Sequence, residues 1–179
     1  MERRLDGEEM KMGVKLVFLD VDGVLNCQFT EDRCDGYIGI DDKYVTNLAK
    51  IVNAFDNVLI VLSSTWRLGF TRYGQELSNH RRYLNDKLAK QGLVIYDSTP
   101  ELSRSGEARG YEIYTWLQQH NDLDIESWVV LDDEYFYDFN QYVGDHLVET
   151  YYYSEYGGLS DEKVKEAIEV LRRVKDEGC

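Results

Sequence analysis

The sequence predicts an α/β protein, a three-layer α/β/α sandwich with a mostly parallel central sheet. Three short segments are almost continuously apolar: Val14–Leu19, Val58–Leu62 and Trp128–Leu131. Such runs indicate strands that are buried on both faces, as in a parallel sheet covered by helices. Segments with apolar residues at helical spacing separate these runs. Strands that alternate with helices favour a parallel sheet between two helical layers.

The first part of the chain is expected to contain one strand and one helix. Residues 1–12 are rich in charge and are expected to form a flexible leader, so that a single domain covers residues 13–179. The stretch from the first strand to Gly39 is expected to be irregular. Asp41 is expected to cap a helix with one apolar face. That face consists of Val45, Leu48, Ile51, Val52 and Phe55.

The middle of the chain is expected to add two helices and a strand. After Val58–Leu62, a polar loop leads to a helix over residues 79–91, which Gly92 ends. A short strand is expected over residues 93–96, followed by a loop over 97–107 that holds the only proline. The next helix is expected over residues 108–120.

The last part of the chain is expected to complete the sheet and one helical layer. A short strand is expected over residues 146–149, after the buried strand at Trp128–Leu131. The Gly157-Gly158 pair breaks the chain, and Ser160 is expected to cap a final amphipathic helix. The apolar face of that helix consists of Val164, Ala167, Ile168, Leu171 and Val174.

Composition limits the classes of function. The net charge of −14 disfavours tight non-specific binding to nucleic acid. Residues 64–110, however, hold eight basic and five acidic residues, so an anionic ligand would find its counter-charges there. No segment is long and apolar enough to span a membrane. Three cysteines without metal-ligand spacing indicate reduced thiols in a cytoplasmic protein, with a Cys27–Cys34 disulfide as the alternative.

Polar residues follow each of the three buried strands. Asp20 and Asp22 follow the first strand, Ser63 and Ser64 the second, and Asp132 and Asp133 the third. The carboxyl ends of parallel strands meet at one edge of the sheet, where ligands bind in α/β proteins. Carboxylates gathered there would repel one another. An oxygen-only set of ligands predicts that Mg²⁺ holds them together, and a basic residue nearby would serve an anionic, phosphorylated substrate.

These motifs resemble those of the haloacid dehalogenase-like (HAD) superfamily of phosphohydrolases, which has a Rossmann-like sheet. The first motif is DVDGV from Asp20, the second is Ser63, and the fourth is the Asp132-Asp133 pair. For the third, basic motif the best match is Arg109. Arg104 is the next candidate, followed by Lys87 and Lys90. The segments FLDVDGVLN, VLSSTWR, ARGYEIYTWL and VVLDDE are similar to the HAD subgroup seen in RNA-repair proteins, which also includes stand-alone bacterial and phage proteins.

The resemblance implies a role for each matching residue. Asp20 would be the nucleophile that forms an aspartyl-phosphate, and Asp22 would be the general acid and base. Mg²⁺ would bind Asp20, the backbone carbonyl of Asp22, and Asp132 or Asp133. Ser63, with Ser64 as a second contact, would bind the phosphoryl oxygens. Arg109 would balance the phosphate charge and keep Asp20 ionised.

Other residues near the motifs have two interpretations. Arg67 lies four residues after Ser63, so it would either bind phosphate or form a surface ion pair. Trp66 and the three histidines are interpreted as packing and structural residues. Asp138 is interpreted as an exposed surface acid, with a further acid that supports the site as the alternative. Seven of the fourteen tyrosines lie between residues 135 and 156, and they would form a packed edge, a dimer interface or a rim that stacks bases.

The segments between the motifs have too few free residues for a separate domain, so little or no cap domain is predicted. The resulting open site favours a large substrate, or a small substrate that an oligomer encloses. The predicted function is a Mg²⁺-dependent phosphatase acting on a phosphate monoester, with a nucleotide or nucleic-acid end as one candidate that the net charge weakens. The alternative is a non-catalytic module that binds phosphate or a partner, and a phosphomutase is a weaker option. No membrane partner is expected, and the sequence leaves the oligomeric state open.

Overall fold

The computed structural model describes residues 13–68, 79–102 and 108–173. The leader predicted over residues 1–12 lies outside the described residues. So do Arg104, which was the second candidate for the basic motif, and Val174 of the final helix.

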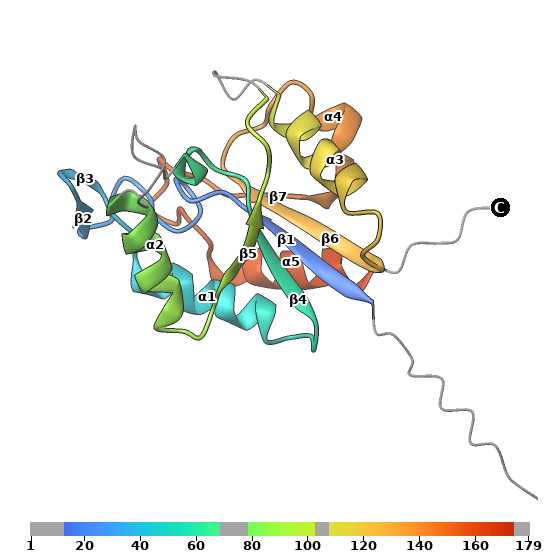
Figure 1. The fold of residues 1–179 in the computed structure, drawn as a ribbon. Coiled ribbons are helices and arrows are strands. Elements are labelled where there is room, and N and C mark those ends of the chain that lie inside the picture. The colour runs from blue at the N-terminus through green and yellow to red at the C-terminus, as the bar shows by residue number, and fades with distance from the viewer. Residues whose placement is uncertain (1–12, 69–78, 103–107, 174–179) are drawn as a thin grey trace, which may run out of the picture.

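A five-stranded sheet forms the centre of the domain, and all its paired strands are parallel (Figure 1). The strand order is β5-β4-β1-β6-β7. The strands are β1 (Val14–Leu19), β4 (Val58–Leu62), β5 (Ile95–Ser98), β6 (Ile125–Asp132) and β7 (Leu147–Glu149). This arrangement confirms the α/β class and the mostly parallel sheet. The first, second and fourth motifs therefore follow the three central strands of the sheet.

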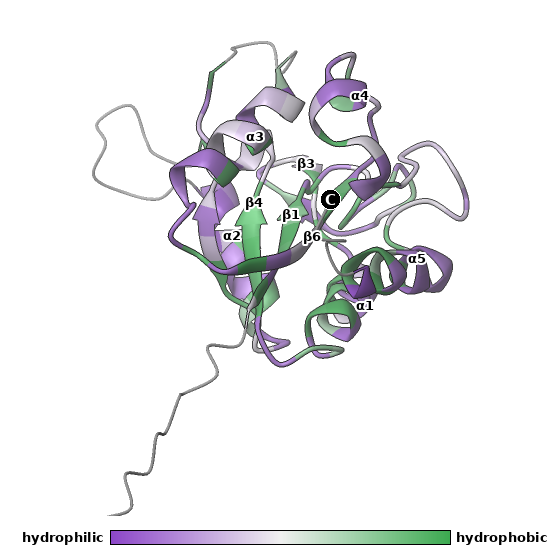
Figure 2. Ribbon diagram, turned by 90° about the vertical axis from the view of Figure 1, so that its right-hand side faces the viewer, coloured by the Kyte–Doolittle hydropathy of each residue, from purple (hydrophilic) through white to green (hydrophobic). Residues whose placement is uncertain are grey.

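Two helical layers cover the sheet (Figure 2). Alternate residues of β1 point to opposite layers: Val17 and Leu19 enter one buried cluster, whereas Leu16 and Phe18 enter the other. The first layer consists of α1 (Asp42–Val52), α2 (Asn79–Ala89) and α5 (Asp161–Arg172). The second consists of α3 (Arg109–Gln119) and the short α4 (Phe139–Tyr142). The predicted three-layer sandwich is therefore confirmed.

The capping residues predicted from the sequence are confirmed at the starts of α1 and α5. The Asp41 carboxylate accepts a hydrogen bond from the backbone N–H of Lys43, 3.0 Å away, at the start of α1. The Ser160 hydroxyl accepts one from Lys163 at the start of α5. Each cap satisfies a backbone donor that the first turn of a helix leaves without a partner.

Two strand boundaries differ from the prediction. Leu93 was expected to begin a strand, but its N–H donates to the carbonyl of Leu88, so it closes the end of α2 after Gly92 (φ +71°) and β5 begins only at Ile95. Strand β6 is longer than expected, because Lys15 of the neighbouring β1 satisfies its polar residues. The Lys15 ammonium donates to Glu126 and Ser127 at 2.7 and 3.2 Å.

The stretch predicted to be irregular contains a small antiparallel hairpin, β2 (Arg33–Cys34) and β3 (Tyr37–Ile38). Asp35 and Gly36 form its two-residue turn, and both have positive φ, 51° and 85°. Asp-Gly is the usual sequence of such a turn. Among the described residues this hairpin is the only structure of its own inserted between β1 and α1, which agrees with little or no cap domain. Two 3₁₀ turns, η1 (Thr65–Arg67) and η2 (Gly144–His146), complete the described elements.

Candidate active site

Three carboxylates meet at the carboxyl edge of the sheet. Asp20 follows β1, Asp132 ends β6, and Asp133 follows it; oxygens from all three lie within 4.8 Å of one another. The Asp20 N–H donates to the carbonyl of Leu131 at 2.9 Å, which holds the first motif against the fourth. Asp20 and Asp132 are buried, with 6% and 1% of their surface exposed. The parallel sheet thus brings together the acids that the sequence places at two strand ends.

A single buried guanidinium bridges two of these acids. Arg109 is the first residue of α3, and its Nη1 lies 3.2 Å from Asp20 Oδ1 and 2.9 Å from Asp132 Oδ2. The same nitrogen donates to the backbone carbonyl of Ser63. The ring of Phe136 lies under the guanidinium, with its centroid 4.9 Å from Cζ. Arg109 therefore connects all three strand ends that carry the motifs.

Three carboxylates facing one buried cation leave the cluster with too much negative charge. Burial raises the pKa of the Asp20 carboxyl, although the Arg109 cation opposes this. Burial, followed by the charge of Asp20, raises the pKa of Asp132 well above its ordinary value. Burial and the charges of Asp20 and Glu134 raise the pKa of Asp133 to about 7. A divalent cation would relieve this repulsion, and a set of carboxylate oxygens suits Mg²⁺.

Gly23 and Asp133 pack directly against each other. Gly23 has φ +75°, and a Cβ added there would overlap the Asp133 carboxyl carbon. The Gly23 carbonyl accepts a hydrogen bond of 2.7 Å from the Thr150 hydroxyl, which fixes the loop. A glycine is therefore required both by the backbone conformation and by the close approach of the carboxylate.

Asp138 supports the start of α3, although it was predicted to be an exposed acid. It is buried, and its two oxygens accept hydrogen bonds from the backbone N–H groups of Gly110 and Tyr111, at 3.1 and 2.9 Å. The residue that precedes α3, Ala108, makes no side-chain cap. Asp138 thus caps the helix from the loop after the fourth motif, and it fixes the turn that carries Arg109.

Asp22 is exposed beside the buried cluster, and two side chains hold it in place. Its Oδ1 accepts a hydrogen bond from the Asn26 amide at 2.9 Å, and its Oδ2 accepts one from the Trp66 indole N–H at 2.8 Å. Trp66 was interpreted as a packing residue, and Asn26 received no role. Both orient the predicted general acid, and no short-range sequence signal connects Trp66 to Asp22.

The two serines after β4 lie beside the cluster and are buried. The Ser64 hydroxyl lies close enough to Asp20 to lower the pKa of that carboxyl, and it accepts the N–H of Trp66 at 3.4 Å. The Ser63 hydroxyl has no hydrogen-bond partner among the residues that the structure describes. A buried polar group without a partner is uncommon and suggests that a ligand completes it.

The structure does not bring Arg67 into the carboxylate cluster. Its guanidinium donates to Glu112 at 2.7 Å and to the Ser64 carbonyl at 3.2 Å. The ion pair is buried, since the two side chains are 6% and 0% exposed. Of its two interpretations, an ion pair matches the geometry, but the pair lies between η1 and α3 rather than at the surface. Lys87 pairs with Asp32 and Asp42, away from the site.

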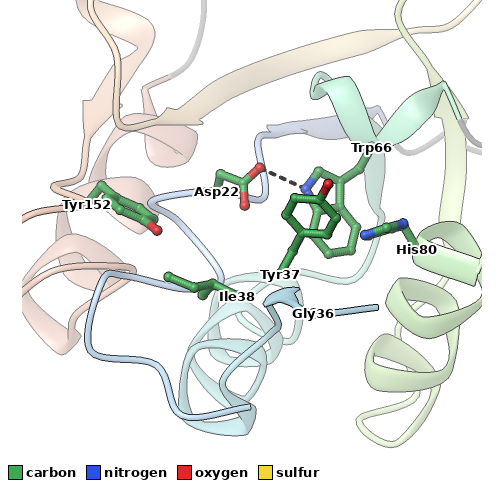
Figure 3. A pocket seen from close by; sticks show the side chains of 7 residues that line it. All are labelled: Asp22, Gly36, Tyr37, Ile38, Trp66, His80 and Tyr152. Carbon is green, nitrogen blue, oxygen red and sulfur yellow. Dashed lines mark hydrogen bonds between the residues drawn. The ribbon is translucent and has the colours of Figure 1, made fainter. Parts of the chain in front are cut away.

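Two cavities open at this edge of the sheet. The smaller has a volume of about 300 Å³, and Asp20, Arg109, Asp132 and Asp133 line it. The larger has about 710 Å³, and its lining includes Tyr37, Trp66 and His80 (Figure 3). Asp22 and Tyr152 line both cavities.

Two of the three histidines pack on tryptophans, whereas the third lines a cavity. The rings of His120 and His146 stack on Trp116 and Trp128, with centroids 3.8 and 3.7 Å apart, as structural residues do. His80 instead lines the larger cavity, and donor atoms of His80, Cys34 and Asp35 lie within 4.8 Å of one another. Cys27 and Cys34 are free, as expected.

Comparisons with known proteins give one result. The sequence model of a family described as "HAD domain in Swiss Army Knife RNA repair proteins" matches residues 16–164. Neither the curated proteins nor the solved structures include a match to the chain. Within the described ranges, no helix has the length and apolar character needed to cross a membrane.

Proposed function

The chain belongs to the family of HAD domains in Swiss Army Knife RNA repair proteins, and from this premise we propose that it is a Mg²⁺-dependent phosphatase of phosphate monoesters. Membership indicates a phosphohydrolase of the HAD type and a phosphorylated substrate. The observation that supports a Mg²⁺-dependent phosphatase is the position of the Arg109 guanidinium between Asp20 and Asp132, with Asp133 beside them. This arrangement provides a nucleophile, a counter-charge and a cation site within one small cavity.

The carboxylates of the cluster would have different roles in the metal site. Asp132 uses one oxygen for Arg109 and the other to accept the N–H of Glu134, at 2.9 and 3.0 Å. Asp133 is half-buried and faces the loop of the first motif. Asp20 and Asp133, with the backbone carbonyl of Asp22, would therefore hold Mg²⁺, while Asp132 braces Arg109. When bound, Mg²⁺ would screen the charge of the nucleophile and of the transferred phosphoryl group.

The reaction would proceed in two displacements. An Asp20 oxygen attacks phosphorus and the bond to the leaving oxygen breaks, while Asp22 gives that oxygen a proton. Asp22 then takes a proton from a water, whose oxygen attacks phosphorus and releases Asp20 and phosphate. Arg109 stabilises charge in both steps, and the unpartnered Ser63 hydroxyl would bind a phosphoryl oxygen. Ser64 would orient Asp20.

Arg67 has no assigned contact with phosphate in this proposal, because its guanidinium is already engaged by Glu112. A nucleotide or a nucleic-acid end is the substrate class favoured here. The name of the family supports RNA ends, while the net charge of −14 weakens binding to a long polynucleotide.

Hydrolysis of p-nitrophenyl phosphate with and without Mg²⁺ tests the proposal. The wild type is expected to turn over only with Mg²⁺, and Asp20→Asn is expected to be inactive because the amide cannot attack phosphorus. The alternative is a module that binds phosphate without catalysis, and the intact Asp20 and Asp22 pair argues against it. No Mg²⁺-dependent turnover on nucleotides, phosphorylated oligonucleotides, sugar phosphates and phosphopeptides would favour that alternative.

A further inference from the structure

The arrangement of the two cavities predicts how the substrate is oriented in the site. Asp20 and Arg109 line only the smaller cavity, whereas Asp22 lies where the two cavities meet. A phosphate attacked by Asp20 would occupy the smaller cavity. Its leaving oxygen must reach Asp22 to receive a proton. The group attached to that oxygen would then extend into the larger cavity.

Aromatic rings from separate parts of the chain line the larger cavity. Figure 3 shows Tyr152 on one side of Asp22, and Tyr37 with Trp66 on the other. The His80 ring lies next to both, with its centroid 5.8 Å from that of Tyr37 and 5.3 Å from that of Trp66. Tyr37 is 70% exposed, so most of its ring is open to a ligand. The volume of about 710 Å³ is in the usual range for a small-molecule site.

We propose that this cavity binds the nucleoside of a nucleotide, with one unpaired base stacked against the aromatic walls. The proposal rests on the phosphatase function and names the leaving group. Flat rings with polar tips suit nucleobases, because every base offers a π face and polar edges. A base in this cavity cannot be paired at the same time, so a duplex end would have to open before it binds.

The basic side chains beside the β2–β3 hairpin favour recognition of a single nucleotide. Near the β2–β3 hairpin, the Lys87 ammonium is already paired with Asp32 and Asp42, at 2.6 and 2.7 Å. The Arg33 guanidinium donates to the backbone carbonyls of Thr30 and Asp32. On this side of the cavity, therefore, both cations are already engaged within the protein, and the net charge of the whole chain is −14. A mononucleotide is therefore expected to be as good a substrate as a longer strand with the same terminal nucleotide, with a weak dependence on salt.

The test compares substrates that share a phosphate and a sugar but differ in the base. The kcat/KM for adenosine 5′- or 3′-monophosphate, whichever is higher, is expected to exceed that for the ribose phosphate with its phosphate on the same carbon by about tenfold or more, as stacking of one base provides. Tyr37→Ala is expected to reduce this ratio by about tenfold, and Tyr37→Phe, which keeps the ring, to restore it. Tyr96→Ala is the matched control, because Tyr96 is a half-exposed tyrosine of β5 outside the cavity.

The outcomes separate this inference from the function on which it rests. Equal hydrolysis of the nucleotide and of the matching ribose phosphate, or a ratio that Tyr37→Ala leaves unchanged, would overturn the nucleoside site while the phosphatase stands. A phosphotyrosine peptide preferred over every nucleotide would overturn it too, as would a long oligonucleotide favoured with a steep salt dependence.

If no monoester is hydrolysed, the proposed phosphatase function is wrong, and a binding measurement then tests the nucleoside site. Adenosine monophosphate is then expected to quench the fluorescence of the wild type, since Trp66 lines the cavity. Quenching that is absent, or equal in Tyr37→Ala, would overturn the site.

Discussion

The indole N–H of Trp66 donates a hydrogen bond to the Asp22 carboxylate, 2.8 Å away. This contact ties the turn after β4 to the first motif, and it sets the direction of the proposed general acid. A hydrogen bond to a charged group contributes about 1.5–3 kcal/mol, so its loss should reduce catalysis where a proton must be delivered.

The effect of Trp66→Phe on kcat/KM is therefore expected to depend on the leaving group of the substrate. For an alkyl phosphate, whose leaving oxygen needs a proton, we expect kcat/KM to fall by about tenfold or more. For p-nitrophenyl phosphate, whose leaving group departs without one, we expect little change. Steady-state kinetics on both substrates measure the difference, with Trp128→Phe on the other face of the sheet as the control. Equal losses on both substrates would show that Trp66 acts through packing alone.

The guanidinium of Arg109 should dominate the stability of the metal-free site. Arg109→Met leaves Asp20 and Asp132 buried without their cation, and such a loss costs about 3–5 kcal/mol. We expect urea unfolding in EDTA to show a decrease of this order, and Mg²⁺ to restore part of it. Arg173→Met is the matched control, because the Arg173–Asp145 pair is exposed and such pairs contribute about 0–1 kcal/mol. Similar effects in the two variants would contradict the prediction.

The sequence predicted the parts of the site that depend on the backbone alone. Parallel strands align their carboxyl ends, so the apolar runs before Asp20, Ser63 and Asp132 were enough to predict that these residues meet. Arg109 was one of four candidates for the basic motif. The sequence predicts where a helix starts, but it does not predict which groups the first side chain of the helix contacts. Among the candidates that the structure describes, Arg109 is the one for which an Nη1 between two carboxylates of the cluster is found.

The sequence could not predict contacts that depend on loop paths. Trp66 and Asp22 are 44 residues apart, and Gly110 and Asp138 are 28 apart, so no local pattern connects them. The β2–β3 hairpin is different, because its Asp35-Gly36 turn is a signal present in the sequence. The flanking strands are only two residues long, too short for an alternating pattern to show.

Asp138 should affect catalysis through the position of α3. Asp138→Ala removes the acceptor for two N–H groups at the start of that helix, and loss of a cap costs about 0.5–2 kcal/mol. We expect kcat to fall as well, because the same turn carries Arg109. Ser160→Ala removes the cap of α5, and it should cost similar stability without lowering kcat. If Asp138→Ala lost stability but kept the wild-type kcat, the helix start would not position Arg109.

The pKa of Asp133 predicts how pH and Mg²⁺ act together on stability. Burial and the charges of Asp20 and Glu134 raise this pKa to about 7, from an ordinary value of 3.8. Between these values the folded protein binds more protons than the unfolded chain. The contribution of Asp133 to the free energy of unfolding is therefore full below pH 3.8 and is lost as the pH rises to about 7.

In EDTA, we accordingly expect the wild type to lose more thermal stability than Asp133→Asn between about pH 5 and about pH 8, since the amide does not titrate. Mg²⁺ competes with the proton for the carboxylate, so its addition should raise the Tm of the wild type more at about pH 8 than at about pH 5. Differential scanning calorimetry at the two pH values measures both effects. An equal Tm shift by Mg²⁺ at both pH values would show that the metal does not displace a proton from Asp133. A wild-type response in Asp133→Asn would mean that Asp133 is not the carboxylate that holds the metal. Asp132 would then take that place, at the expense of its contact with Arg109, and the division of roles between the two acids would be reversed.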